Sequence, residues 1–217
     1  MTERSTKRQQ QAQATKQSLF DSALALFKEK GFDAVTVEDI TQRAGTAKGS
    51  FYTHFRNKSD IVLEEFRTID QHYRNWSRNL KRYPTTRAKL LALTRAQMRY
   101  VRDAVGLPTL KILYASNILD PLAEKILIDK SRFLHQLVRE ILLEGQSRRQ
   151  VRSDISADHL AQMYNRACRS VFLDWAISND AYDLVKDGVE FCETLMLPAL
   201  LVPGDASAPP HAQLQQI

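Results

Sequence analysis

Apolar residues recur at intervals of three and four along most of the chain, which is the spacing of one face of a helix. The first stripe contains Leu19, Ala23, Leu24 and Phe27, and it predicts a helix over about residues 15–30. Gly31 follows, and glycine readily takes the left-handed conformation that ends a helix.

Between residues 35 and 58 the pattern predicts two short helices joined by a tight turn. Thr36 is expected to cap the first helix, and Asp39 stands at the position of a capping-box partner. Gly45 is expected to end that helix, and a second helix is predicted over about residues 48–55. Two short helices around a glycine-containing turn are typical of a helix-turn-helix, which places its second helix in the major groove of DNA.

The rest of the chain continues with helical stripes, punctuated by Pro, Gly, Asn and Asp. No segment has the alternating pattern and hairpin turns of strands, so an all-α fold is predicted. A polar, basic loop is expected over residues 147–156, and residues 203–217 are rich in Ala, Pro and Gln and are expected to be disordered. Further helices are predicted at about residues 60–83, 86–104, 110–119, 121–145, 157–178 and 181–201.

Charge is consistent with a polyanionic partner. The 217-residue chain is 43% hydrophobic, as expected of a folded protein, and has a formal net charge of +6. Residues 42–58 contain four bases and no acid. Residues 1–12 are polar and basic, and we predict a flexible arm that reaches DNA; a solvated terminus without DNA contacts is an equal alternative.

The sequence offers no catalytic or cofactor-binding pattern. None of its seven glycines belongs to a phosphate-binding loop, its histidines lack zinc-site spacing, and no serine lies in a nucleophile elbow. We therefore expect no enzyme, no cofactor and no metal. Cys168 and Cys192 fit small core residues in a reducing cytosol better than a redox pair. Without a signal segment or membrane-spanning run, a cytoplasmic protein is predicted.

The string AGTAKGSFYTHFRNK at residues 44–58, with Gly31-Phe32 and Val35-Thr36-Val37 before it, resembles the DNA-binding domain of TetR-family transcriptional regulators. The resemblance covers roughly residues 13–66. It implies phosphate contacts at Thr36, Tyr52, His54 and Lys58. It implies base-edge or close backbone contacts at Thr46, Ala47, Lys48, Gly49, Ser50 and Thr53.

Two positions depart from the family pattern. Ala47 stands where members often have serine, so the capping hydroxyl of the second helix is expected to come from Thr46. Glu38 stands where some members have a basic residue, and its carboxylate would repel phosphate. A base contact at position 38 is therefore not expected.

The resemblance also implies what the rest of the chain does. Residues 67–202 are expected to form a helical bundle for ligand binding and dimerisation, and the helix over residues 60–83 to transmit the ligand's presence. The protein would be a homodimeric repressor on a palindromic operator of double-stranded DNA, released by a small-molecule effector.

Two sets of residues are candidates for these tasks, and for both the alternative is ordinary packing within the chain. The candidate effector pocket comprises Met98, Leu110, Leu113, Tyr114, Asn117, Phe133, Tyr164 and Cys168. The candidate dimer interface comprises Leu160, Tyr164, Ala167, Val171, Trp175, Val185, Val189, Cys192 and Met196.

A second function remains open from the sequence, namely a non-enzymatic helical adaptor that binds protein partners. In that case the basic segment would serve solubility. A gel shift with DNA from the protein's own promoter separates the two hypotheses, because only a regulator binds it.

Overall fold

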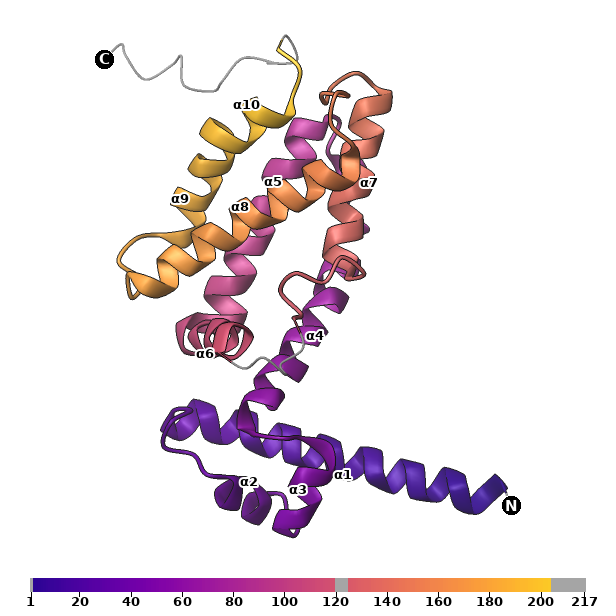
Figure 1. The fold of residues 1–217 in the computed structure, drawn as a ribbon, viewed down its shortest axis with the longest axis vertical. Coiled ribbons are helices and arrows are strands. Elements are labelled where there is room, and N and C mark those ends of the chain that lie inside the picture. Colours follow the sequence, from indigo (N-terminus) through magenta and orange to yellow (C-terminus); the bar gives the residue numbers. More distant parts are fainter. Residues whose placement is uncertain (1, 120–124, 204–217) are drawn as a thin grey trace. The chain divides into compact units, whose positions relative to one another are not determined.

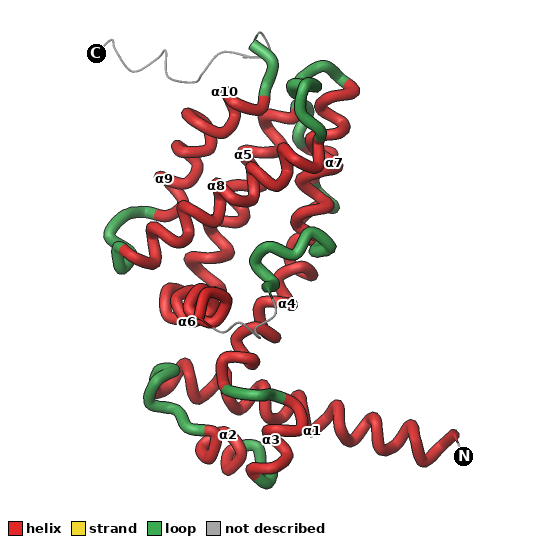
Figure 2. Tube along the Cα trace, in the orientation of Figure 1, coloured by secondary structure: helices red, strands yellow, loops and turns green. Residues whose placement is uncertain are grey.

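A computed structural model describes residues 2–119 and 125–203 of the chain. The predicted all-α fold is confirmed, since the described residues contain helices and turns, with one isolated bridge between Val151 and Leu201 in place of any strand (Figures 1 and 2). The chain forms two compact units. The smaller contains the described parts of residues 1–69 and 108–128, and the larger contains those of 70–107 and 129–217.

The smaller unit is organised around a three-helix core. Its helices are α1 (Thr2–Lys30), α2 (Val37–Arg43), α3 (Lys48–His54), the first part of α4 (Lys58–Ser77) and most of α6 (Gly106–Leu119). Both α2 and α3 pack against α1. The buried core that joins them consists of Leu19, Ala23, Leu26, Val35, Ile40, Phe51, Phe55 and Ile61.

The larger unit is a bundle in which α7 packs on α8, and α5 packs on both α7 and α9 (Figure 1). Its α-helices are α5 (Thr86–Tyr100), α7 (Phe133–Ser147), α8 (Ala157–Ile177), α9 (Leu184–Phe191) and α10 (Leu197–Leu200). A 3₁₀ turn, η1 (Leu80–Arg82), precedes α5, and the π-helical turns η2 (Val101–Val105) and η3 (Cys192–Met196) follow α5 and α9.

At the N-terminus, helix α1 begins earlier than the apolar pattern predicted. The segment expected to be a flexible arm, residues 2–12, is helical as far as the structure describes it. Its Lys, Arg, Gln and Ala residues are good helix formers, so the helix continues without an apolar face. Periodicity alone therefore missed its start.

Three later helices are shorter than predicted. Helix α4 ends at Ser77, before η1, and α9 begins only after Asp183, whose Oδ1 accepts hydrogen bonds from the N–H groups of Val185 and Lys186. The helix predicted over 121–145 starts at Phe133. Of its missing part, residues 121–124 lie outside the described residues, and the chain from 125 to 132 forms turns in which Asp129 accepts from Ser131 N at 2.8 Å. Such local side-chain bonds compete with a helix.

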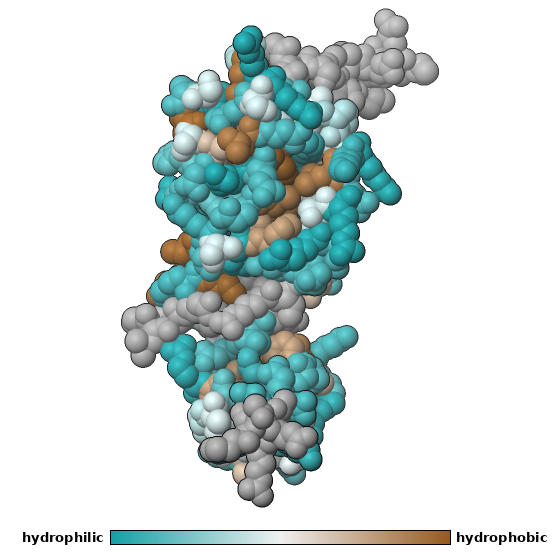
Figure 3. Space-filling model, turned by 90° about the vertical axis from the view of Figure 1, so that its right-hand side faces the viewer, coloured by the Kyte–Doolittle hydropathy of each residue, from teal (hydrophilic) through white to brown (hydrophobic). Residues whose placement is uncertain are grey.

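The visible surface is mainly hydrophilic, with apolar side chains showing in limited areas (Figure 3). Within the residues that the structure describes, no helix combines the length and apolarity needed to span a bilayer.

Candidate nucleic-acid interface

The first short helix, α2, begins with the predicted capping box. Thr36 Oγ1 accepts a hydrogen bond from Asp39 N at 3.1 Å, and Asp39 Oδ2 accepts one from Thr36 N at 2.8 Å. The bonds from the Thr36 hydroxyl and amide hold the pKa of Asp39 below its usual value, so the carboxylate stays ionised. The box fixes the point at which the chain enters the motif.

The turn between α2 and α3 depends on Gly45, which has a positive φ of 66° as predicted. The expected hydroxyl cap on α3 is wrong. Ala47 is the N-cap, without a side-chain hydrogen bond, and the buried Thr46 Oγ1 finds no partner among the described residues. The backbone instead orders the turn, because Thr46 N donates to Thr41 O at 2.9 Å.

Helix α3 has one buried face and one exposed face. Phe51 is fully buried and Phe55, which follows the helix, is nearly so. On the other side Lys48, Gly49 and Thr53 are exposed, and the Tyr52 side chain is 54% exposed. The burial of Phe51 therefore directs the polar side of α3 outward. The other predicted contacts divide into exposed and half-buried positions: Thr36 and Ala47 are exposed, whereas Thr46, Ser50, His54 and Lys58 are half-buried.

Lys48 and Glu38 form an ion pair that links α3 to α2. Both side chains are more than half exposed, so the pair lies at the surface. The hydrogen bond between them lowers the pKa of Glu38 and raises that of Lys48. Sequence reasoning treated Glu38 only as a repulsive charge. The pairing could have been inferred from the opposite charges near the starts of two adjoining helices.

Lys58 has a structural task that the sequence did not reveal. Its Nζ donates to the carbonyl oxygens of Phe32 at 2.6 Å and Val35 at 3.0 Å, and it lies 4.3 Å from the centre of the Phe32 ring. These bonds tie the start of α4 to the loop between α1 and α2.

The residues predicted for an effector pocket are mostly buried and lie on four helices. Met98 of α5 lies against Gly188 of α9, since a Cβ on that glycine would come within 2.7 Å of Met98 Sδ. The Tyr164 hydroxyl of α8 lies 2.7 Å from Thr94 Oγ1. Cys168 is fully buried, and burial raises the pKa of its thiol, so it is neither a thiolate nor a nucleophile.

The remaining candidates lie on α6 and α7. Leu110, Leu113 and Tyr114 are buried on α6, where Asn117 Nδ2 donates to Leu113 O at 3.1 Å. Phe133 is the first residue of α7, and the centre of its ring lies 4.4 Å from Cζ of the Arg74 guanidinium. A pocket of the larger unit is lined by none of the eight predicted residues. Among the residues described, no cluster of His, Cys, Asp and Glu could hold a metal ion.

The residues predicted for a dimer interface are the inward stripes of α8, α9 and η3. Most of them pack within the protomer, and as contacts with a second copy they stay a prediction. Ala167, Val185 and Val189 are half-buried, and the following are buried: Leu160, Tyr164, Val171, Trp175, Cys192 and Met196. An apolar stripe identifies a buried face without saying what covers it.

The fold and this surface together define a helix-turn-helix protein with an exposed, partly basic recognition helix. A family model described as "Bacterial regulatory proteins, tetR family" matches residues 19–64. The transcriptional repressor DhaR of Mycobacterium sp. (strain GP1) is 30% identical over 152 residues, which cover 67% of this chain and 74% of that protein. The probable acrEF/envCD operon repressor of Escherichia coli K12 is 25% identical over 86% of this chain and 87% of its own length.

A solved structure supports the fold over nearly the whole chain. Thermus thermophilus FadR, a TetR-family transcriptional repressor in complex with lauroyl-CoA, superimposes with a TM-score of 0.71 at 23% identity. The match covers 89% of this chain and 98% of that one. The chain belongs to the TetR family of bacterial regulatory proteins, and it is a DNA-binding transcriptional regulator.

Proposed function

We propose that this protein is a cytoplasmic repressor that binds a palindromic operator as a homodimer and leaves it when a small-molecule effector binds. The observation that carries the DNA-binding part is the exposed face of α3, where Lys48, Tyr52 and Thr53 are held outward by the buried Phe51. One α3 from each protomer would enter the major groove of each half-site. The names of the relatives favour repression over activation.

Residue roles follow from position and chemistry. Hydroxyl, imidazole and ammonium groups around the ends of α2 and α3 suit phosphate oxygens, whereas small residues at the start of α3 let its backbone approach base edges. We assign phosphate contacts to Thr36, Tyr52, His54 and Lys58. We assign base-edge or close backbone contacts to Thr46, Ala47, Lys48, Gly49, Ser50 and Thr53.

For the dimer interface we propose the outward positions of the same helices that the sequence indicated. Met163 and Ile177 on α8 are 43% and 71% exposed, and Leu195 of η3 is 60% exposed. Two such helical segments from each protomer would form an isologous four-helix contact. Sedimentation at micromolar concentration should show a dimer, and Leu195→Glu should shift the protein towards monomer. A native monomer would remove the palindromic-operator argument.

Effector binding is assigned to residues 67–202 and DNA binding to residues 13–66, with α4 connecting them. An effector would release the operator by binding more tightly to a conformation whose recognition helices do not match the half-site spacing. The eight pocket candidates on α5, α6, α7 and α8 stay a prediction. Effector contacts can be located by screening small molecules for loss of operator binding and then substituting those residues.

The decisive experiment selects bound fragments from genomic DNA and measures their affinity for variants. Lys48→Ala and Tyr52→Ala should each weaken operator binding at least tenfold, because a good base or phosphate contact contributes roughly 1–3 kcal/mol. The matched control is Lys186→Ala, since Lys186 is an exposed lysine of α9 and should leave affinity unchanged. Normal binding by both α3 variants, or no enriched site, would contradict the proposal.

A further inference from the structure

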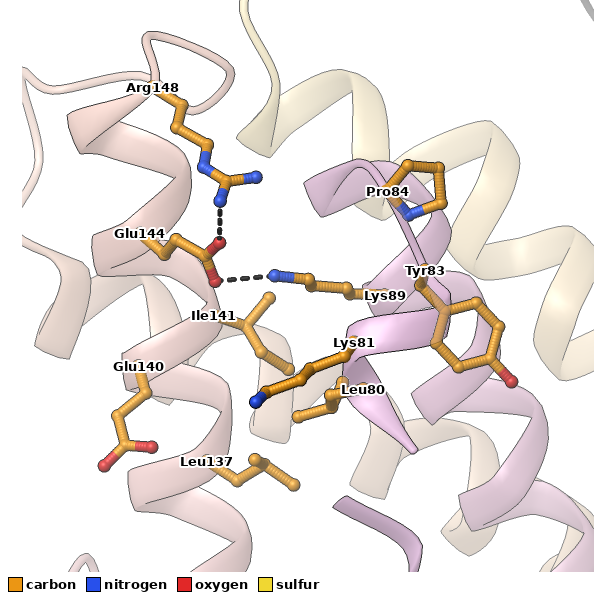
Figure 4. Close-up of a pocket in the computed structure, with 10 residues that line it drawn as sticks. All are labelled: Leu80, Lys81, Tyr83, Pro84, Lys89, Leu137, Glu140, Ile141, Glu144 and Arg148. Carbon is orange, nitrogen blue, oxygen red and sulfur yellow. Dashed lines mark hydrogen bonds and ion pairs between the residues drawn. The ribbon is translucent and has the colours of Figure 1, made fainter. Parts of the chain in front are cut away.

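The larger unit contains a pocket on the side where η1 and the start of α5 face α7 (Figure 4). Its volume is about 470 Å³, within the range of small-molecule sites. Leu137 and Ile141 form a buried apolar surface on the α7 side. The lining residues are Leu80, Lys81, Tyr83, Pro84, Lys89, Leu137, Glu140, Ile141, Glu144 and Arg148.

One end of the pocket is closed by an internally satisfied charge cluster. Glu144 accepts from Lys89 Nζ at 2.6 Å and lies 2.7 Å from Arg148 Nη2 (Figure 4). The bond from Lys89 lowers the pKa of Glu144, so the carboxylate stays ionised at neutral pH. The Lys89 side chain is only 11% exposed, which fixes this end of the pocket. Glu144 is therefore already neutralised by the protein.

The opposite end presents a cation that the protein does not neutralise. Lys81 extends from η1 towards α7, and it makes no ion pair or hydrogen bond with any described residue (Figure 4). Glu140 also lacks such a partner, but its carboxylate lies at the outer edge of α7 in the same view. Counting Lys81, Lys89 and Arg148 against Glu140 and Glu144, the lining carries three positive and two negative charges, a formal excess of +1.

We propose that this pocket binds a small amphipathic monoanion, with its carboxylate on the Lys81 ammonium and its apolar body against Leu80 and Tyr83. A carboxylate cancels the formal excess of +1 in the lining and gives the Lys81 ammonium a partner, and a charge-assisted bond to an ammonium is among the stronger polar contacts. Leu137 and Ile141 are already buried, so the apolar surface that the ligand removes from water is that of the half-buried Leu80 and Tyr83. This site shares no residue with the predicted effector pocket, and the proposal does not depend on operator binding.

A tryptophan provides a local signal. Trp76, near the end of α4, stacks on Tyr83 with ring centroids 6.3 Å apart, and Tyr83 lines the pocket. A ligand that contacts Tyr83 should change the fluorescence of Trp76. The other tryptophan, Trp175, is buried on α8 and does not line the pocket. Trp76→Phe should therefore remove the signal while calorimetry still reports binding.

The test titrates the full-length protein with octanoate, octan-1-ol and octylamine, which share a chain and differ in the charge of the head group. Octanoate should bind most tightly. Lys81→Met keeps most of the apolar stem and removes the charge, so it should weaken octanoate binding roughly tenfold or more and leave octanol unchanged. The matched control is Lys186→Met, which makes the same charge change outside the pocket and should bind octanoate like the native protein.

Several outcomes would overturn the assignment. Octylamine binding more tightly than octanoate would mean that Glu140 selects the ligand. Equal octanoate affinity in Lys81→Met and native protein, or no octanoate binding in the millimolar range, would also refute it. Lys81 is exposed and unbonded among the described residues, so Lys81→Met should fold normally, and unchanged helical circular dichroism verifies this.

Discussion

The helix-turn-helix and the core of the larger unit use polar side chains in opposite ways. On α3, Lys48 and Tyr52 are exposed to solvent, and Lys48 pairs with Glu38 at the surface. Between α5 and α8, Thr94, Gln97 and Tyr164 are buried and bond to one another, with Gln97 Nε2 donating to Tyr164 Oη at 3.3 Å. A polar residue on a helix therefore indicates binding only when the folded protein leaves it exposed. Buried polar residues that hydrogen-bond to one another instead help to specify how the core packs.

The largest predicted loss of stability is expected in the smaller unit alone. Phe51→Ala removes a fully buried ring from the small core that holds α3, and such truncations cost about 3–5 kcal/mol. A three-helix core has little stability to spare, so we expect operator binding to be lost and the smaller unit to unfold. Thermal circular dichroism should then show a minor part of the helical signal missing at 25 °C, with the remainder melting at a higher temperature.

The matched control for Phe51→Ala is Leu93→Ala, which truncates a fully buried residue of α5 in the larger unit. This substitution should lower the free energy of unfolding of the larger unit by about 2–5 kcal/mol. The temperature of the main melting transition should fall, while operator binding at low temperature persists. If both variants shift one common transition equally, the two units unfold as one, and the contrast between them does not extend to stability.

The next largest loss of stability is expected when the hydrogen-bond network of Thr94, Gln97 and Tyr164 is broken. Tyr164→Phe removes the hydroxyl that accepts from Gln97, leaving that amide without its acceptor in a dry core, at a cost of about 1–3 kcal/mol. Tyr182→Phe is the control, because the Tyr182 hydroxyl donates to Val171 O at 3.0 Å from a half-buried position that water can reach. Urea unfolding should show the larger loss for Tyr164→Phe. Equal losses would mean that the network contributes no more than a surface bond.

The same contrast explains what could be predicted from the sequence. The capping box of Thr36 and Asp39 and the positive φ of Gly45 are local, since they depend on residues a few positions apart. Phe51 and Phe55 are four positions apart, which is the spacing of one helix face, so their shared burial is also a local feature. The motif and its exposed face follow from such signals.

The hydrogen bonds of Lys58 and Tyr164 join residues far apart in the chain, so no local sequence pattern predicts them. Lys58 binds carbonyls 26 and 23 positions earlier, and Tyr164 bonds to Thr94 across 70 positions. The apolar stripe of α8 that contains Leu160 has the same spacing whether its own chain or a second protomer covers it. For this reason the spacing of these residues does not separate the core of the protomer from a dimer interface.

A smaller effect is predicted for Lys58, which bonds to the loop between α1 and α2 and which we propose also contacts phosphate. Lys58→Met deprives Phe32 O and Val35 O of their donor and should destabilise the smaller unit by about 1–2 kcal/mol. Because the substitution also removes a proposed phosphate contact, all DNA sequences should bind more weakly, and the salt slope should flatten by roughly one unit. Lys28→Met, an exposed lysine of α1, should change neither quantity. A lower stability with an unchanged slope would restrict Lys58 to its structural task.

The smallest predicted effect concerns Glu38, whose ion pair with Lys48 is expected to compete with DNA for the Lys48 ammonium. The pairing lowers the pKa of Glu38, so its carboxylate is charged at neutral pH and opposes the approach of phosphate. Glu38→Gln removes that charge and releases the ammonium, so binding to all DNA should tighten by roughly two- to fivefold at low salt, with the gain shrinking as salt is added. Glu29→Gln makes the same charge change at the surface pair with Arg43 and leaves Lys48 bound to Glu38. If only Glu38→Gln increases the affinity for DNA, the ion pair with Lys48 weakens DNA binding by the native protein. If both variants increase the affinity equally, the change in net charge alone explains the result.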